Sequence, residues 1–444
     1  MRTGATDLWR VIGFAMPALP LSIVMFPSYT ILPSFYAENT EVTLAFVGTA
    51  LIIARIFDVV VDPVIGHFCD RTPRSLGGRK TWVLSGSVVL AAFGAFLYAP
   101  PATAGPMYYL IAMLGFYLGY SMIEISHKAM GTDLIRDYRG RSTIATALGT
   151  CFALGNLGFA LMPVLSGEGK FNAATLEIVA YAIAILGPLT ALIAISAVPA
   201  ALPDTGSRAL TGTSFFAIAH KNYPLKHFLG SYLLVGLGQG IFYGLVYLYV
   251  TKVLQLGDQF VFVLLTDAVV TLFAVPIWRQ LVVMLQKHRA LALGVIVASM
   301  SICGMWFVDT GAGSSAELLL FLIAVRAFGA AVLYVAPNAL IGDIVDYEWL
   351  RRGANRAANC HALVTVFTKM GATVGGGAGL ILLDLVGFEA QGVNGEAVNQ
   401  AFRVIALAVP AVLLLGSALM AFTFPLDRRA HGVVLRRLER RGHA

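Results

Sequence analysis

The sequence predicts an all-α membrane protein with twelve transmembrane helices in two six-helix bundles, and two properties of its composition indicate this fold class. Of its 444 residues, 58% are hydrophobic and only 12% are charged, whereas a soluble domain carries about 25% charged residues. The mean hydropathy is correspondingly high, at +0.78. A helix needs about 20 mostly apolar residues to cross the hydrocarbon core. The polar surface of a soluble multidomain protein is missing here.

Twelve apolar runs are long enough to span a membrane, and a polar stretch from Pro203 to Lys226 separates the first six from the last six. We predict spans at 10–37, 42–69, 80–101, 105–131, 141–166, 174–200, 228–252, 258–283, 288–308, 315–343, 358–386 and 399–424. The predicted domains are an N-terminal bundle (1–200), a cytoplasmic linker (201–227), a C-terminal bundle (228–424) and a basic cytoplasmic tail (425–444). Two such halves joined by a longer connection are the arrangement of the major facilitator superfamily.

The basic residues are placed for membrane topology rather than for nucleic-acid binding. Most of the 31 Lys and Arg lie in the N-terminus, the even-to-odd loops and the tail, whereas Lys170 and Lys252 lie in the opposite loops. Positive charge concentrates on the cytoplasmic side, so we expect both termini in the cytoplasm of a bacterial cell and the chain in its inner membrane. We also expect a monomer whose basic tail touches anionic lipid.

Three charged residues lie inside the second span, where charge is costly. Arg55, Asp58 and Asp62 are spaced by three and four residues, which places them on one helical face. Such a group costs about 2.5 to 3.5 kcal/mol on insertion scales, so it usually faces a cavity and a partner. Arg55 can neutralise Asp58 as a structural pair, but this leaves Asp62 unpaired. Two carboxylates one turn apart can hold Na⁺ or trade a proton, so this face is a candidate cation site.

Charged residues of two other spans are candidate partners of that face. In the fourth span, Glu124 and Lys128 are four residues apart and can pair along the helix. In the eleventh span, Lys369 lies near the middle. A lysine that pairs with the carboxylates only when the cation is absent would couple cation binding to conformation.

Candidate substrate contacts are polar or aromatic positions of the fourth, seventh, eighth and tenth spans. Asp267 and Arg326 can be either a structural ion pair or a substrate contact. The full set is His127, Lys128, Gln239, Tyr243, Asp267, Arg326 and Asn338. Because this set includes cations, an anionic solute is one hypothesis.

Two segments at the cytoplasmic ends of spans are candidate gates or latches. One follows the second span and runs from Gly66 through Asp70 and Arg71 to Arg79. The other follows the tenth span and contains Asp343, Asp346 and Arg356. A separate pattern concerns packing: glycines four residues apart, at 236, 240 and 244 and at 371, 375 and 379, let helices approach closely.

These motifs together resemble the glycoside–pentoside–hexuronide:cation symporters. The resemblance is carried by Arg55-Ile-Phe-Asp58 through Asp62-Pro63, by Asp343-Ile-Val-Asp346-Tyr347 and by Phe367-Thr368-Lys369. It implies that Asp58 and Asp62 bind the coupling cation, with Glu124 in support and Lys369 nearby. The chain departs from the family at Ile125-Ser126-His127-Lys128, where an aromatic residue that stacks on sugar is usual.

The sequence therefore predicts a cation-coupled symporter that imports a small polar, anionic or sugar-derived solute with Na⁺ or H⁺ by alternating access. Two alternatives stay open: a transporter of a lysolipid or other amphipathic lipid, and a non-transporting receptor on a transporter scaffold. The sequence contains no hydrolase elbow, phosphate-binding loop or zinc-binding helix motif, so we expect neither an enzyme nor a cofactor other than the coupling ion.

Overall fold

A computed structural model describes residues 5–134, 138–167, 169, 171–198, 222–310, 313–352 and 357–440. These residues form helices and connecting segments, with no β-strand among them. They contain twelve helices that are long and apolar enough to cross a membrane, which confirms the predicted fold class. Arg356, one of the predicted gate residues, lies outside the described residues, as does most of the predicted linker.

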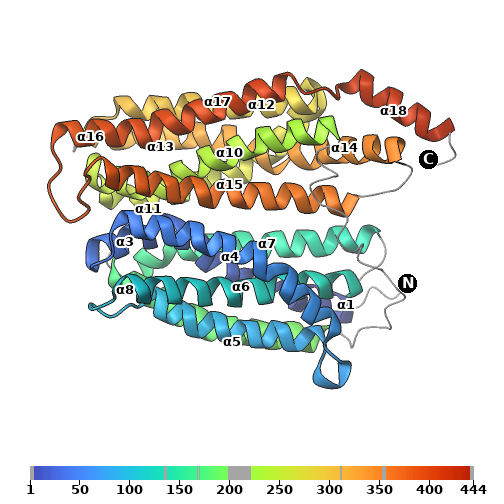
Figure 1. The fold of residues 1–444 in the computed structure, drawn as a ribbon, viewed down its shortest axis with the longest axis horizontal. Coiled ribbons are helices and arrows are strands. Elements are labelled where there is room, and N and C mark those ends of the chain that lie inside the picture. The colour runs from blue at the N-terminus through green and yellow to red at the C-terminus, as the bar shows by residue number, and fades with distance from the viewer. Residues whose placement is uncertain are drawn as a thin grey trace. The chain divides into compact units, whose positions relative to one another are not determined.

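The chain divides into two compact units, of which the first contains Met1–Ser207 and the short segment Glu389–Val393. Its long helices run side by side (Figure 1), with α5 packed against both α6 and α8 and with α4 packed against α6. The elements of this unit are α1 (Ala5–Ala15), α2 (Ala18–Thr30), α3 (Leu32–Asn39), α4 (Leu44–Arg71), η1 (Arg74–Leu76), α5 (Arg79–Tyr98), α6 (Pro106–Leu134), α7 (Tyr138–Leu165) and α8 (Ala173–Ala197).

The second unit contains Arg208–Phe388 and Asn394–Ala444. In it α10 packs along α15 and α17, and α11 packs against α13. Its elements are α10 (Tyr223–Leu248), η2 (Tyr249–Val253), η3 (Gly257–Gln259), α11 (Phe260–Leu285), α12 (Lys287–Gly304), η4 (Met305–Phe307), α13 (Gly313–Ala330), η5 (Ala331–Tyr334), α14 (Ala336–Arg352), α15 (Ala357–Leu385), α16 (Glu396–Arg403), η6 (Val404–Ala408), α17 (Val409–Phe422) and α18 (Arg428–Arg440).

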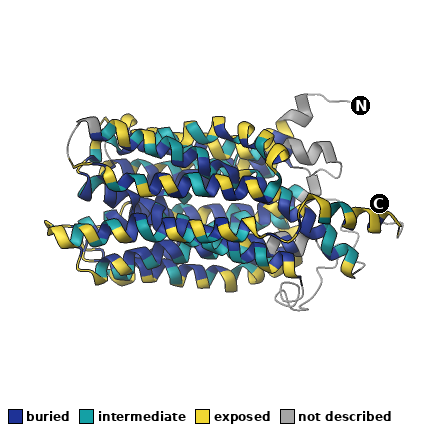
Figure 2. Ribbon diagram, turned by 90° about the horizontal axis from the view of Figure 1, so that it is seen from above, coloured by how far each residue is buried: buried dark blue, intermediate teal, exposed yellow. Residues whose placement is uncertain are grey.

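Helix α8 shows why these segments are stable as membrane spans. Its exposed side chains Tyr181, Ile185, Leu189 and Leu192 recur every three or four residues and are apolar or aromatic, so one stripe of the helix faces outward. Buried and exposed residues share the same helices throughout (Figure 2). A helix satisfies its own backbone hydrogen bonds, which a segment surrounded by lipid must do.

The glycines of α10 and α15 allow these two helices to pack at backbone contact. A Cβ atom on Gly240 would overlap the carbonyl oxygen of Ala372, and one on Gly236 would lie 2.9 Å from the Cα of Gly371. Larger residues at these positions would force the helices apart, so the predicted packing role of the glycine spacing is confirmed.

Two predicted spans contain breaks that lie next to prolines. The run predicted at 10–37 forms α1, α2 and α3, with breaks next to Pro17 and before Pro33. The run predicted at 315–343 breaks into α13, the 3₁₀ turn η5 and α14. Pro337 lacks the N–H that would bond to the carbonyl of Leu333 in a continuous helix. Helix α14 also runs to Arg352, beyond the predicted end of this span.

Asn222 fixes the beginning of α10 in the second unit. Its Oδ1 accepts a hydrogen bond from the backbone N–H of Leu225 at 3.0 Å and so caps α10. Its Nδ2 donates to Oε2 of Glu348 on α14 at 2.9 Å. Both side chains are buried, so a single asparagine sets where α10 starts and ties this start to α14.

Candidate functional site

The buried face of α4 carries the first charged cluster. The Arg55 Nη1 donates to Asp58 Oδ2 at 2.6 Å, and both residues are buried. The three-residue spacing brings these side chains together on one turn of helix. The two opposite charges therefore neutralise each other, which offsets part of the free-energy cost of placing charge inside a span.

Asp62 lies one turn further along α4 and is not satisfied in the same way. Its Oδ1 is buried and has no hydrogen-bond partner among the described residues. An isolated buried carboxylate oxygen is costly, and native structures seldom keep one without a function. Pro63 follows directly, inside the helix. A cation or a proton bound at this oxygen would supply the missing partner.

Helix α6 packs against α4 and contributes side chains near this cluster. Tyr120 lies close enough to both Asp58 and Glu124 to interact with them electrostatically, and Tyr117 does so with Asp58. Glu124 Oε1 accepts from Lys128 Nζ at 2.7 Å, with Lys128 mostly exposed and Glu124 mostly buried. Tyr120 is therefore a common neighbour of Glu124 and Asp58, and Lys128 is paired with Glu124.

His127 is engaged in packing between helices. Its ring stacks on Phe14 of α1 with centroids 4.2 Å apart, and its Nε2 lies 2.6 Å from the Phe14 carbonyl oxygen. The residue is buried. This arrangement gives His127 a role in joining α1 to α6, and the substrate contacts that we propose do not include it.

A second charged cluster lies in the second unit, around Arg326. This arginine is 1% exposed, forms an ion pair with Asp267 of α11 and donates from Nη1 to the Tyr243 hydroxyl of α10 at 3.2 Å. Its guanidinium also lies over the rings of Phe242 and Tyr243, at 4.9 and 5.0 Å from their centroids. Cation–π contact and ion pairing together stabilise the buried charge.

The accessible groups of this cluster are Asp267 and Tyr334. The side chain of Asp267 is 23% exposed. Tyr334, at the end of η5, is 67% exposed and lies within electrostatic reach of Asp267 and Arg326. Asn338, one turn further on, is exposed and donates to the Tyr334 carbonyl at 3.3 Å. These polar groups lie close to the interruption of the span, and interrupted helices are typical of solute sites in transporters.

Gln239 and Lys369 are the remaining predicted site residues of this unit. The Oε1 of Gln239 is buried and has no hydrogen-bond partner among the described residues, and Gln239 lies one turn before Tyr243 on α10. Lys369 is half-buried on α15. Its predicted pairing with the α4 carboxylates joins residues of different units and stays a prediction.

Two of the predicted latch residues, Asp70 and Arg79, form an ion pair at the end of α4. Arg79 Nη2 lies 2.9 Å from Asp70 Oδ1, and its Nη1 donates to the carbonyl of Ala129 on α6 at 3.2 Å. Arg71 is exposed. Sequence reasoning missed the neighbouring Lys80, whose Nζ donates to the carbonyls of Ile195 and Val198 at the end of α8.

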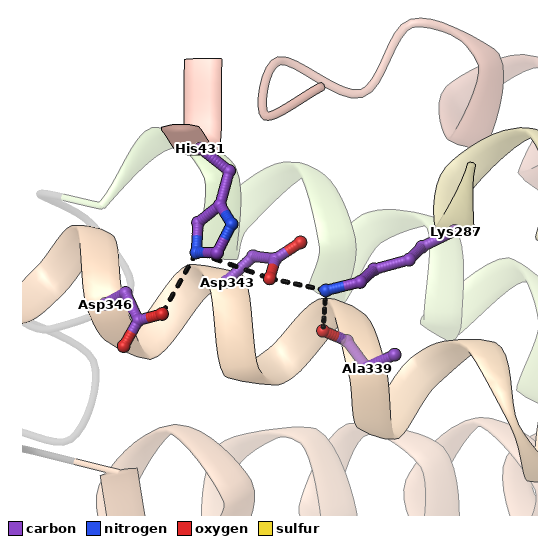
Figure 3. Close-up of polar contacts among 5 residues, drawn as sticks. All are labelled: Lys287, Ala339, Asp343, Asp346 and His431. Atoms are coloured by element: carbon purple, nitrogen blue, oxygen red, sulfur yellow. Dashed lines mark hydrogen bonds and ion pairs between the residues drawn. The ribbon is translucent and has the colours of Figure 1, made fainter. Parts of the chain in front are cut away.

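The second latch segment lies inside α14 rather than in a loop (Figure 3). Asp343 Oδ1 lies 2.6 Å from Lys287 Nζ, at the start of α12. His431 of α18 brings its Nε2 to 3.0 Å from Asp346 Oδ2 and 3.4 Å from Asp343 Oδ1. Sequence reasoning missed both Lys287 and His431, because basic residues in loops and tails are expected from topology alone and carry no signal of their partners.

No cluster of three or more His, Cys, Asp or Glu side chains that could hold a metal ion occurs among the described residues. A Na⁺ ion on the α4 carboxylates would therefore draw its other ligands from neutral oxygens such as hydroxyls and backbone carbonyls. The assignment of the cation to Asp58 and Asp62 stays a prediction.

Twelve membrane spans with charged clusters buried among them define an integral membrane transporter. The chain belongs to the MFS/sugar transport protein family, whose model matches residues 13–428. This confirms the family resemblance. The chain is accordingly a symporter-type transporter of a small molecule and not an enzyme.

The glucuronide carrier protein homolog of Escherichia coli (strain K12) is 22% identical over 440 residues, which cover 96% of this chain and 95% of that protein. The sodium-dependent lysophosphatidylcholine symporter 1 of Gallus gallus is 23% identical over 428 residues, covering 86% and 80% of the two chains. Among solved structures, the nucleoside transporter NupG superposes with a TM-score of 0.67 at 14% identity and covers 95% of this chain and 98% of its own. This last likeness concerns the fold alone.

Proposed function

We propose that this transporter couples the movement of a hydroxylated, sugar-type solute to a cation bound at Asp58 and Asp62, with Glu124 in support. The single observation that carries the proposal is the buried Asp62 Oδ1, which has no hydrogen-bond partner among the described residues. Arg55 already neutralises Asp58. A Na⁺ ion or a proton at Asp62 supplies a partner to this buried oxygen, so cation binding stabilises this arrangement of α4.

The cation is tested by the thermal stability of the purified protein in Na⁺ and in choline at constant ionic strength. A ligand that binds only the folded state raises its stability, by about 2.7 kcal/mol at a hundred times its dissociation constant. We expect Na⁺ to stabilise the wild type and not the Asp62→Asn variant, whereas Asp309→Asn, an exposed acid outside the cluster, responds like the wild type. Equal stabilisation of wild type and Asp62→Asn contradicts a Na⁺ site there.

Proton coupling has its own test, because paired carboxylates serve either ion. An imposed pH gradient drives solute uptake into vesicles through the wild type if Asp62 carries a proton. The same gradient then has no effect on Asp62→Asn. If neither ion acts through Asp62, the proposed coupling site is wrong.

For the solute, the charge balance favours a neutral hydroxylated molecule over an anion. Three cations suggested an anionic substrate: Lys128, Arg326 and Lys369. Lys128 and Arg326 are paired with carboxylates, and Lys369 is half-buried on α15. Asp267 presents an accessible carboxylate beside the exposed ring of Tyr334. A carboxylate accepts hydrogen bonds from hydroxyl groups, and an aromatic ring offers a flat apolar face to a sugar ring.

The solute is tested with neutral methyl hexosides and the hexuronates that differ from them by a carboxylate. We expect a neutral member to stabilise the wild type more than its hexuronate does. The Asp267→Asn and Tyr334→Ala variants should weaken this binding about tenfold or more, because a buried hydrogen bond or stacking contact is lost. Tyr181→Ala, whose side chain is equally exposed on α8, is the matched control. Stabilisation by lysophosphatidylcholine and not by any hexoside would favour a lipid transporter instead.

We also propose that the chain resides as a monomer in a bacterial inner membrane with both termini in the cytoplasm, and that its two six-helix halves alternate access to the solute. This orientation follows from the distribution of Lys and Arg between the two sets of loops. Reporter fusions at residue 444 and in the loop after α8 test it, since both positions should report the cytoplasm.

A further inference from the structure

Helix α18 is amphipathic, and its two faces have different partners. Val434 and Leu438, four residues apart, are buried. The opposite surface is basic, with a single acid, Glu439, among its exposed charges. The exposed arginines are Arg428, Arg429, Arg436, Arg437 and Arg440. No described residue forms a salt bridge with any of them.

The buried face of α18 holds this helix on the second unit. Helix α18 packs on α14, and His431 extends from it to Asp346 and Asp343 (Figure 3). Asp427 caps the start of α18 by accepting from the backbone N–H of Ala430 at 2.7 Å. The helix is therefore ordered by one face and leaves its arginines to another partner.

The position of α18 along the chain restricts what that partner is. The membrane span that contains α17 ends at Phe422, and α18 begins at Arg428. The connecting residues 423–427 span at most about 20 Å even when fully extended. Helix α18 is thus confined to the membrane boundary, next to the lipid headgroups at that end of the span.

We propose that α18 is a membrane-surface helix that binds anionic phospholipid headgroups through its five exposed arginines. Guanidinium groups form paired hydrogen bonds with phosphate. Val433 and Leu435 are exposed apolar side chains among these arginines, as expected of a helix that lies in the interface and inserts its apolar residues between headgroups. The basic face, the apolar residues within it and the short connection to a span all favour a bilayer surface as the partner of α18.

The two faces of α18 couple the lipid to the transporter. The face opposite the arginines contacts α14 through His431, and Asp343 of α14 also binds Lys287 of α12. Lipid that orders α18 therefore also favours the contacts that hold the ends of α12 and α14 together. A bilayer without anionic lipid leaves these contacts to the protein alone.

Hydrogen exchange of the full-length protein in nanodiscs tests this proposal. We compare amide exchange over 428–440 in discs of phosphatidylcholine alone and in discs that also contain phosphatidylglycerol. Each arginine near an anionic leaflet strengthens binding about fivefold, so exchange in α18 should slow about tenfold or more with phosphatidylglycerol. Salt at 1 M should reverse the change, because it screens interactions between charges that are more than about 3 Å apart.

Variants separate the two faces. Replacing all five arginines by glutamine should abolish the slowing of exchange in α18 by phosphatidylglycerol. Amide exchange in the membrane spans should stay unchanged. His431→Ala should speed exchange in α18 in phosphatidylcholine and preserve the slowing by phosphatidylglycerol. Glu439→Gln, which removes the acid from the basic face, should respond at least as strongly as the wild type. Identical exchange of wild-type α18 in both lipid mixtures overturns the proposal, and this comparison needs no variant to fold.

Discussion

Arg55 and Asp58 form a buried ion pair on a single turn of α4, with 2.6 Å between Nη1 and Oδ2. The pair neutralises itself, and Asp62 lies one turn further along the same helix. The helix is thus stable as a span, and Asp62 is the carboxylate that we propose for the cation.

Breaking this pair from one side should be more harmful than removing it altogether. Arg55→Gln leaves Asp58 as an uncompensated buried charge and should lower the free energy of unfolding by about 3 to 5 kcal/mol. The double variant Arg55→Gln/Asp58→Asn should recover most of that loss, since no charge remains unpaired. Thermal unfolding in detergent measures both.

Lys128→Gln is the control for this comparison, because its ion pair with Glu124 is largely exposed on the lysine side. It should cost less than about 1 kcal/mol. A loss as large as that of Arg55→Gln would mean that Lys128 is buried in the folded state.

His127 should matter for stability and not for solute binding. His127→Phe keeps the stacking on Phe14 and removes the polar contact with its carbonyl, so the free energy of unfolding should fall by about 1 kcal/mol. The affinity for the stabilising hexoside should stay unchanged. A loss of solute affinity without a loss of stability would return His127 to the substrate site.

The contact between α10 and α15 should tolerate no added methyl group. Gly240→Ala places a Cβ against the carbonyl of Ala372 and should destabilise the protein by about 1 to 3 kcal/mol. Gly158→Ala, on α7, meets no atom of the described residues within 4 Å and should be neutral or stabilising by up to about 1 kcal/mol. Equal melting temperatures for the two variants would show that α10 and α15 can separate freely.

Asp343 should hold two elements at once. Asp343→Asn weakens its bonds to Lys287 and His431, so tryptic cleavage within α18 should become faster, whereas overall stability falls only by about 1 kcal/mol because Lys287 is partly exposed. Asp343→Asn/Asp346→Asn removes both acids that His431 contacts and should release α18 further. Unchanged cleavage in the double variant would show that Val434 and Leu438 alone hold the helix.

Much of the fold could be predicted from the sequence because the membrane imposes strong rules. Span length and apolar composition identify the twelve helices, and helical spacing identifies the contacts between Arg55 and Asp58 and between Glu124 and Lys128. These pairs depend on local geometry only. The glycine spacing of α10 and α15 likewise has one common use in a membrane helix.

Contacts between distant segments could not be predicted in the same way. His431 lies 85 residues beyond Asp346 along the chain, and neither helix period nor topology relates the two. The interruption at η5 depends on Pro337, yet many prolines, such as Pro63 in α4, lie within continuous helices. Which proline breaks a span is decided by the packing around it.

Asn222 makes two hydrogen bonds, one to the first turn of α10 and one to Glu348 of α14. Together they have a consequence for how the linker before α10 can change. The anchor lies wholly within the second unit, so it needs nothing from the residues that connect the halves. We therefore expect insertions or deletions before Asn222 to leave the register of α10 unchanged. The length of the linker could then vary without moving the helices that follow it.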